Sequence, residues 1–143
     1  MFKSILIPID IAHRSSWQFA LPQAIELARN SGAVVTVITV VREMTSMFEG
    51  VYFQFQVEQL IEDARTKLSQ IVSENPADGV SIRQEVRLGS IGHEILAAAR
   101  AQGSDLIVMA SHRPEMQDYL IGPNAAHVAR HAECSVLILR RFE

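Results

Sequence analysis

Four short runs of almost continuous apolar residues recur along the chain, and each is too short for a typical helix. The runs cover residues 5–9, 34–41, 106–110 and 136–139 and are rich in Ile and Val. Such runs are typical of parallel strands that helices cover on both faces of a sheet. Pro8 must then lie near the end of the first strand, where a missing amide is tolerated.

A fifth strand is predicted over residues 81–88, where the pattern alternates instead of staying apolar. One face would carry Ile82, Gln84, Val86 and Leu88, and the other would carry Ser81, Arg83, Glu85 and Arg87. An alternation with one polar face is typical of a strand at the edge of a sheet, with that face in solvent.

Helical periodicity fills the segments between the strands. The first stripe runs from Trp17 to Ala28 after a cap at Ser15 or Ser16, and Pro22 is expected to bend it. Further helices are predicted over 57–72, from Ser90 to about Gly103, and over 124–132. The alternation of strands and helices predicts an α/β fold with an open, doubly wound parallel sheet, as one domain over residues 1–143.

Composition and charge exclude several classes of partner. Apolar residues make up 48% of the 143 residues, the formal net charge is −3, and the thirteen basic residues are scattered, which argues against nucleic-acid binding. No apolar stretch reaches membrane-spanning length, and the amino terminus lacks a signal-peptide pattern. The single cysteine, Cys134, permits no internal disulfide. We therefore expect a soluble, cytoplasmic protein with no membrane partner.

In doubly wound sheets, ligands bind beyond the carboxyl ends of the strands, where the strand order reverses. Asp10 follows the first strand, residues 40–42 end the second, and a long segment follows Ala110. These strand ends are the candidate ligand-binding positions.

The segment after Ala110 passes through a polar loop containing Arg113 and enters a helix at Gly122. A helix start offers unpaired amides to an anion, here those of Asn124 and Ala125, and Arg113 could add a charged contact. Pro123 suits the first helical position. A plain capped helix with an exposed arginine explains the same residues equally well.

The chain resembles the universal stress protein family along its whole length. The resemblance is carried by residues 5–10, by Gly89 before the third helix and by the tail 105–140, in which 131–139 is similar to the closing helix-to-strand junction of the family. It implies a five-stranded sheet in the order 3-2-1-4-5 with helices on both faces. It also implies a homodimer through the last strand, Ser135 to Arg140, and leaves open whether dimers pair into tetramers.

One branch of the family binds ATP through a Gly-x-x-Gly loop, nine further residues and then Gly-Ser or Gly-Thr. Ala110 and Arg113 occupy the positions of the two loop glycines, and Gly122 matches the later glycine after a stretch, 114–121, that is one residue short. Pro123 replaces the Ser or Thr, which removes a hydroxyl and an amide. The altered loop nevertheless resembles that of a subgroup in which ATP binding is expected.

The resemblance implies that Asp10 meets the adenosine and that backbone near Val40 and Val41 bonds the adenine edge. The complete set of expected ATP contacts is Pro8, Asp10, Val40, Val41, Met109, Ala110, Ser111, Arg113, Gly122, Pro123, Asn124 and Ala125. The expected cofactor is ATP, with or without Mg²⁺.

Two functions remain open on the sequence. One is an ATP-binding stress-response protein in which the nucleotide acts as a switch, with slow hydrolysis at most, because no convincing base, nucleophile or metal set is present. The alternative is a dimeric interaction module of the same fold with an empty, degenerate site.

Three further features are interpreted from the sequence. His127 and His131 could face one metal, although a solvated helix face is favoured. Cys134 is expected to be a buried structural thiol. Residues 43–53 are a candidate flap or partner patch, or an ordinary connection.

Overall fold

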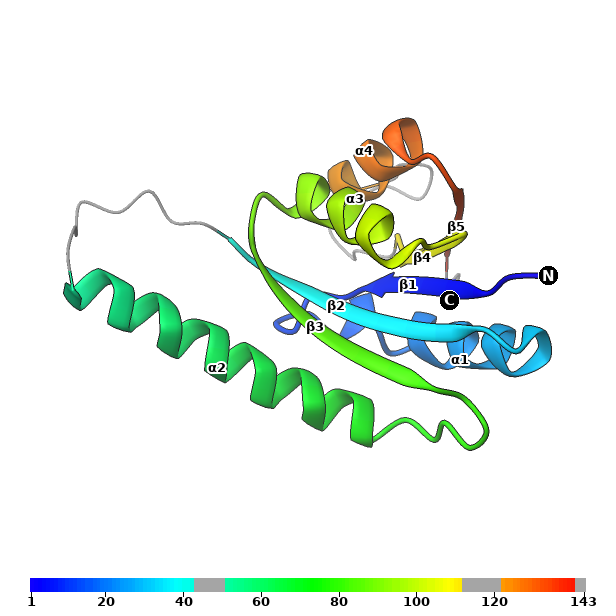
Figure 1. Ribbon diagram of the computed structural model, residues 1–143, viewed down its shortest axis with the longest axis horizontal. Helices are drawn as coiled ribbons and strands as arrows, with labels where there is room; N and C mark the ends of the chain where they lie inside the picture. Colours follow the sequence, from blue (N-terminus) through cyan, green and yellow to red (C-terminus); the bar gives the residue numbers. More distant parts are fainter. Residues whose placement is uncertain (43–50, 112–121, 141–143) are drawn as a thin grey trace.

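The computed structural model describes residues 1–42, 51–111 and 122–140, which form a five-stranded parallel sheet with helices on both faces (Figure 1). The strand order β3-β2-β1-β4-β5 confirms the predicted doubly wound fold. The strands are β1 (Ser4–Pro8), β2 (Val34–Arg42), β3 (Ile82–Gly89), β4 (Leu106–Ala110) and β5 (Ser135–Leu139). The helices are the short 3₁₀ turn η1 (Arg14–Ser16), α1 (Ala20–Ser31), α2 (Val51–Ser73), α3 (Ile91–Gln102) and α4 (Pro123–His131).

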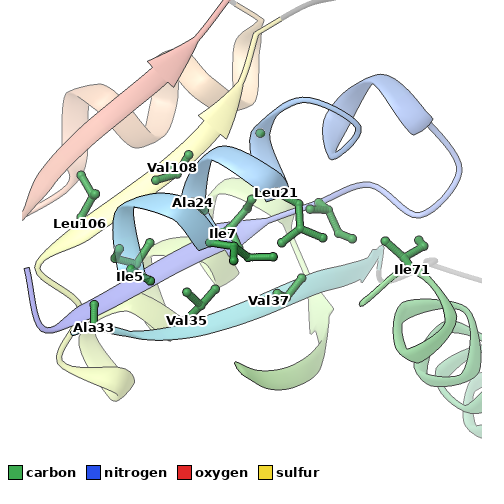
Figure 2. Close-up of a cluster of buried hydrophobic side chains, with 14 of the residues drawn as sticks. Ile5, Ile7, Leu21, Ala24, Ala33, Val35, Val37, Ile71, Leu106 and Val108 are labelled. Carbon is green, nitrogen blue, oxygen red and sulfur yellow. The ribbon is translucent and has the colours of Figure 1, made fainter. Parts of the chain in front are cut away.

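The central strand β1 is buried on both faces, as its unbroken apolar run predicts. Successive side chains of a strand point to opposite faces, so Ile5 and Ile7 belong to one hydrophobic core and Leu6 to the other. The first core packs beneath α1 and the second half of α2 (Figure 2). The second core packs beneath α3 and α4, with Ile95 and Val128 among its buried members.

Asp105 fixes the start of β1 beside the start of β4. Its carboxylate accepts hydrogen bonds from the backbone N–H groups of Lys3 (2.9 Å) and Ser4 (3.1 Å). Its own backbone N–H donates to the carbonyl oxygen of Ser4 (2.9 Å). These bonds lead directly into the parallel register in which Ile5 lies opposite Leu106.

The first helix differs from its predicted form. The chain turns through η1 after β1, and α1 begins at Ala20 instead of directly after the serines. Pro22 therefore lies in the first turn of α1, where backbone amides have no acceptor within the helix, and its missing N–H breaks no helical bond. The physical reason for expecting Pro22 to bend the helix is therefore absent.

The edge position of β3 is confirmed, but its polar face is not simply open to solvent. Arg87 bonds Glu94 of α3 (3.0 Å) and its strand neighbour Glu85 (2.6 Å), and Gln102 of α3 also reaches Glu85 (3.4 Å). The side chains of Arg87, Glu85 and Glu94 are 23%, 27% and 19% exposed. The polar alternation of β3 thus reflects an ion-pair network beneath α3.

The opposite edge strand, β5, was predicted from its apolar run to be covered on both faces. Its residues 136–139 are only partly buried, and Ser135 is exposed. Its neighbour in the sheet is β4 alone. An edge position explains the difference, since a strand with one neighbour has fewer elements packed around it.

The long helix α2 is buried only in its second half. Ala64, Leu68 and Ile71 pack on the sheet, whereas Phe55 and Leu60 are 64% and 41% exposed. Figure 1 shows the first half of α2 extending away from the sheet. Of the segment proposed as a flap or patch, residues 51–53 belong to α2 and 43–50 lie outside the described residues. No helix in the described part of the chain is long and apolar enough to cross a membrane.

The Asp105 contacts predict a pH-dependent contribution to stability. Burial opposes ionisation of this carboxyl, but the N–H groups of Lys3, Ser4 and Asp105 itself, with the charged amino terminus, outweigh burial and lower its pKa. A carboxyl with a lowered folded-state pKa stabilises the fold above its unfolded-state pKa, and this contribution is lost as pH falls through the folded-state value. We expect Asp105→Asn to lower the free energy of unfolding by about 1–2 kcal/mol at neutral pH.

Urea denaturation at a series of pH values measures this effect. The difference between wild type and Asp105→Asn should shrink steadily in acid. The control is Asp78→Asn, because Asp78 is exposed and its carboxylate has no hydrogen-bond partner within the described residues. A difference that does not change with pH would contradict the assigned role of the Asp105 carboxylate.

Candidate functional site

A cavity of about 410 Å³ lies at the carboxyl ends of β1, β2 and β4. Here β1 is flanked by β2 on one side and β4 on the other, which is the reversal point of the strand order and the usual ligand position in such sheets. The lining residues are Pro8, Ile9, Asp10, His13, Ser15, Ser16, Val40, Arg42, Ile91, Ile95, Met109, Ala110, Ser111, Gly122, Asn124 and Ala125.

The structure brings most of the expected ligand contacts together in this cavity. Those that line it are Pro8, Asp10, Val40, Met109, Ala110, Ser111, Gly122, Asn124 and Ala125. Arg113 and the rest of its loop, 112–121, lie outside the described residues. The candidate site is therefore built from three strand ends and the start of α4.

Two of the expected contacts do not line the cavity. Val41 is the strand neighbour of Val40 and Arg42, which both line it, so the Val41 side chain points to the other face of β2. Pro123 is the exposed first residue of α4, between the lining residues Gly122 and Asn124. Successive helix residues point in different directions, which takes the proline ring away from the cavity.

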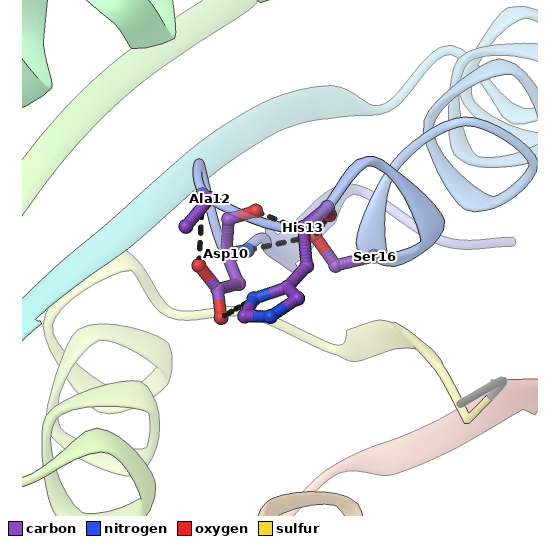
Figure 3. Close-up of polar contacts among 4 residues, drawn as sticks. All are labelled: Asp10, Ala12, His13 and Ser16. Atoms are coloured by element: carbon purple, nitrogen blue, oxygen red, sulfur yellow. Dashed lines mark hydrogen bonds and ion pairs between the residues drawn. The ribbon is translucent and has the colours of Figure 1, made fainter. Parts of the chain in front are cut away.

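A compact polar turn follows β1 and holds Asp10 at the cavity (Figure 3). The Asp10 carboxylate accepts hydrogen bonds from the Ala12 backbone N–H (2.9 Å) and from His13 Nδ1 (2.8 Å). The Asp10 N–H donates to Ser16 Oγ (2.8 Å), and that hydroxyl lies within bonding distance of the carbonyls of Asp10 and His13. Asp10 therefore shapes its own turn, while its side chain remains 46% exposed and open to a ligand.

The wall formed by α3 and β4 is largely apolar, with one polar exception. Ile91, Ile95 and Met109 line this side. Ser111 lies just beyond β4, and its Oγ is buried without a hydrogen-bond partner among the described residues, although its backbone N–H bonds the Leu139 carbonyl (3.0 Å). A flat apolar group bearing hydrogen-bonding edges, such as a purine, fits these surroundings.

Sequence reasoning assigned no ligand contact to several residues that line the cavity: Ile9, His13, Ser15, Ser16, Ile91 and Ile95. Ser15 and Ser16 were interpreted as helix caps, because the 3₁₀ turn between β1 and α1 gives no distinct pattern. Ile91 and Ile95 carry the spacing of a buried helix face, and this face reaches the cavity only in the first turns of α3. Arg42 was a candidate strand-end position in the sequence, although it was not among the expected ATP contacts.

A second hollow, of about 380 Å³, adjoins the first. It is lined by Arg42, Gly89, Ser90, Ile91, Gly92 and Asn124. The two spaces share Arg42, Ile91 and Asn124 as lining residues, so they lie next to each other. The second hollow lies at the carboxyl end of β3 and the start of α3.

The two glycines of this hollow are tightly constrained. A Cβ at Gly89 would lie 2.9 Å from Cγ of Glu94, and its φ of +148° disfavours any other residue. A Cβ at Gly92 would lie 2.5 Å from Cδ2 of His127. Both positions admit only hydrogen as a side chain with the present packing of α3.

Neither rival site forms a chemical centre in the described part of the chain. The exposed rings of His127 and His131 lie with centroids 4.7 Å apart, and the described residues hold no group of three or more potential metal ligands. Cys134 is half-buried; burial raises the pKa of its thiol, and the carboxylates of Asp105 and Glu133 raise it further. Such a thiol is protonated at neutral pH and is a poor nucleophile.

Comparison with known proteins gives one consistent result. The sequence profile of the universal stress protein family matches residues 1–140. Universal stress protein G of Shigella flexneri is 32% identical over 144 residues, covering 98% of this chain and all of the relative.

Solved structures of similar fold include that of the hypothetical protein MJ0577, which was used for a structure-based assignment of biochemical function. It is 25% identical with a TM-score of 0.83, over 100% of this chain and 99% of that one. A universal stress protein in complex with cAMP is 19% identical with a TM-score of 0.65, over 97% of both chains.

Proposed function

The chain belongs to the universal stress protein family of stress-response proteins, and from this premise we propose that it binds ATP, with or without Mg²⁺, as a switch. The observation that carries the proposal is the cavity at the reversal point of the sheet. Three strand ends and the start of α4 meet there, and they hold most of the residues that the sequence marks for an adenine nucleotide. The bound nucleotide would set the shape of the protein or its choice of partner.

Each part of the cavity suits one part of a nucleotide. The apolar wall of Ile91, Ile95 and Met109 would pack against the base, whose edge would bond the backbone near Val40. The Asp10 carboxylate would accept a hydrogen bond from a ribose hydroxyl in addition to those it already accepts. Any Mg²⁺ would be held mainly by the phosphates and water.

The start of α4 would hold the phosphates despite its proline. Ala126 N–H makes the first helical bond, to the Gly122 carbonyl (2.9 Å). The amides of Asn124 and Ala125 precede it and have no acceptor within the helix, so they remain for an anion. Pro123 removes one donor but leaves these two. Arg113 stays a proposed phosphate contact on sequence grounds.

Catalysis is not part of the proposal beyond slow hydrolysis. Rapid phosphoryl transfer ordinarily requires positioned groups around the reacting phosphate as well as metal ions. The sequence offers no convincing general base or nucleophile for such a step, so the proposal is a binding role.

We also propose that two copies pair through Ser135 to Arg140 in the cytoplasm. Strand β5 bonds β4 on one side, and its other edge has no strand beside it in the described sheet. An apolar edge strand that is only partly buried favours pairing with a second chain. Pairing of such dimers into tetramers would need a further surface.

The first experiment is to denature the purified protein, identify released small molecules by chromatography and titrate the emptied protein calorimetrically with ATP and Mg²⁺. Recovered adenine nucleotide, or saturable ATP binding, is the expected result. Titration with cAMP is added because a protein of the same fold carries that ligand. If no nucleotide is released and neither ATP nor cAMP binds, the interaction module with an empty site is favoured. Ala110 and Pro123, which depart from the ATP-binding loop of the family, would then explain the loss of binding.

The Asp10 turn makes a second prediction. Asp10→Ala should weaken ATP binding by about 1–2 kcal/mol, because it removes a charged acceptor at the cavity. Ser16→Ala is the matched variant, since it disturbs the bonds to the Asp10 backbone but keeps the carboxylate. Its effect on affinity should be smaller. Equal losses in the two variants would assign Asp10 a role only in shaping the turn.

The dimer predicts a third outcome, measured by sedimentation velocity. The wild-type protein should sediment as a dimer. Leu137→Lys in β5 should give monomers, because Leu137 is only partly buried against the first core and a second copy would cover the rest of this position. Leu88→Lys is the control, since Leu88 is 39% exposed on the opposite edge strand β3. Thermal melting checks that both variants fold. A folded Leu137→Lys protein that stays dimeric would place the interface elsewhere.

A further inference from the structure

We infer that Arg42 makes this cavity selective for phosphorylated ligands, by contacting a phosphate of the bound nucleotide where the cavity meets the second hollow. This inference rests on the proposed nucleotide binding. It goes further by naming a specificity-determining residue, which the sequence analysis gave only as a candidate strand-end position, and by stating the chemical class that it selects.

The position of Arg42 is the first argument. It is the last residue of β2, it is exposed, and it lines both the cavity and the adjoining hollow. Asn124, at the start of α4, also lines both spaces. A ligand group that extends from the cavity toward Asn124 would therefore come close to the guanidinium of Arg42.

The second argument is that Arg42 has no internal partner. Within residues 1–42, 51–111 and 122–140 it makes no hydrogen bond or ion pair. The carboxylates at this edge are already engaged: Glu85 and Glu94 bind Arg87, and Asp10 accepts bonds from its own turn. A guanidinium free of such partners is available to an anionic ligand, and phosphate is an anion that its fork of donors matches.

The division of the lining into apolar and polar parts is the third argument. The base has an apolar wall of its own at Ile95 and Met109, which do not line the second hollow. Besides Arg42 and Ile91, the hollow is lined by Gly89, Ser90, Gly92 and Asn124. Charged phosphate, and not the base, suits this polar end.

Gly89 and Gly92 contribute only backbone to the lining of the hollow. The places where their Cβ atoms would lie are already filled by the side chains of Glu94 and His127. Arg42 is therefore the only residue with a cationic side chain among the described residues that line the hollow.

The test compares ATP with adenosine, using calorimetric titration of nucleotide-free protein. Arg42→Gln should weaken ATP binding by about tenfold to a hundredfold, the scale of a lost charge-assisted bond, and leave adenosine binding unchanged. Arg42→Lys should recover part of the ATP affinity, because it keeps the charge but not the fork. The control is Arg83→Gln, since Arg83 is an exposed arginine of β3 that does not line the cavity or the adjoining hollow.

A second readout is the dependence of ATP affinity on salt, which needs no adenosine binding. Screening weakens an exposed ionic contact, so Arg42→Gln should bind ATP with a shallower salt dependence than wild type.

Unchanged ATP affinity in Arg42→Gln would overturn the inference about Arg42 and leave the proposed ATP binding intact. Equal losses for ATP and adenosine would also overturn it, because Arg42 would then act on the base or the ribose. If wild type binds no adenine compound, the proposed function falls and the inference falls with it.

Discussion

The burial of β1 between two parallel neighbours and two helical layers constrains the position of everything else. Because its side chains alternate between two cores, β1 tolerates no shift in register without exposing Ile5 and Ile7 or Leu6. Asp105 ties the beginning of this strand to β4 through backbone donors. With the register fixed at one end, the other ends of β1, β2 and β4 come together at one edge. The cavity lies there because parallel strands must all end on the same side.

The cavity edge is built mostly from backbone and from short turns that stabilise themselves. Asp10 illustrates this, since its carboxylate is held by Ala12 and His13 before any ligand arrives. A polar group that is already oriented loses less conformational freedom on binding than a free side chain does. At the start of α4, amides would play the same part toward an anion. Ala110 keeps its main-chain N–H, and Pro123 removes one amide but leaves those of Asn124 and Ala125.

A helix or strand could be predicted from the sequence when many residues shared its pattern. Five strands and their alternation with helices were readable because whole runs of Ile and Val defined them, and the strand order came from resemblance to a family. The turn around Ser16 was not readable, since a 3₁₀ turn held by one hydroxyl leaves no periodic pattern. The polar face of β3 misled for a different reason. Its charges pair with Glu94 from a helix whose position depends on tertiary packing.

The same reasoning explains why the candidate site was only partly predictable. Residues at strand ends could be located from the strands alone, which placed Asp10, Val40 and Ala110 correctly at the edge. Whether a residue at that edge faces the cavity depends on which face of the sheet its side chain occupies. Side chains alternate along β2, so Arg42 lines the cavity and its neighbour Val41 does not. Which charges remain free depends on every ion pair around them. Arg87 is bound by two carboxylates, whereas Arg42 has none among the residues that the structure describes. No property of either arginine in the sequence distinguishes them. The proposed selectivity for phosphate would therefore arise from the pairing of charges in the folded chain.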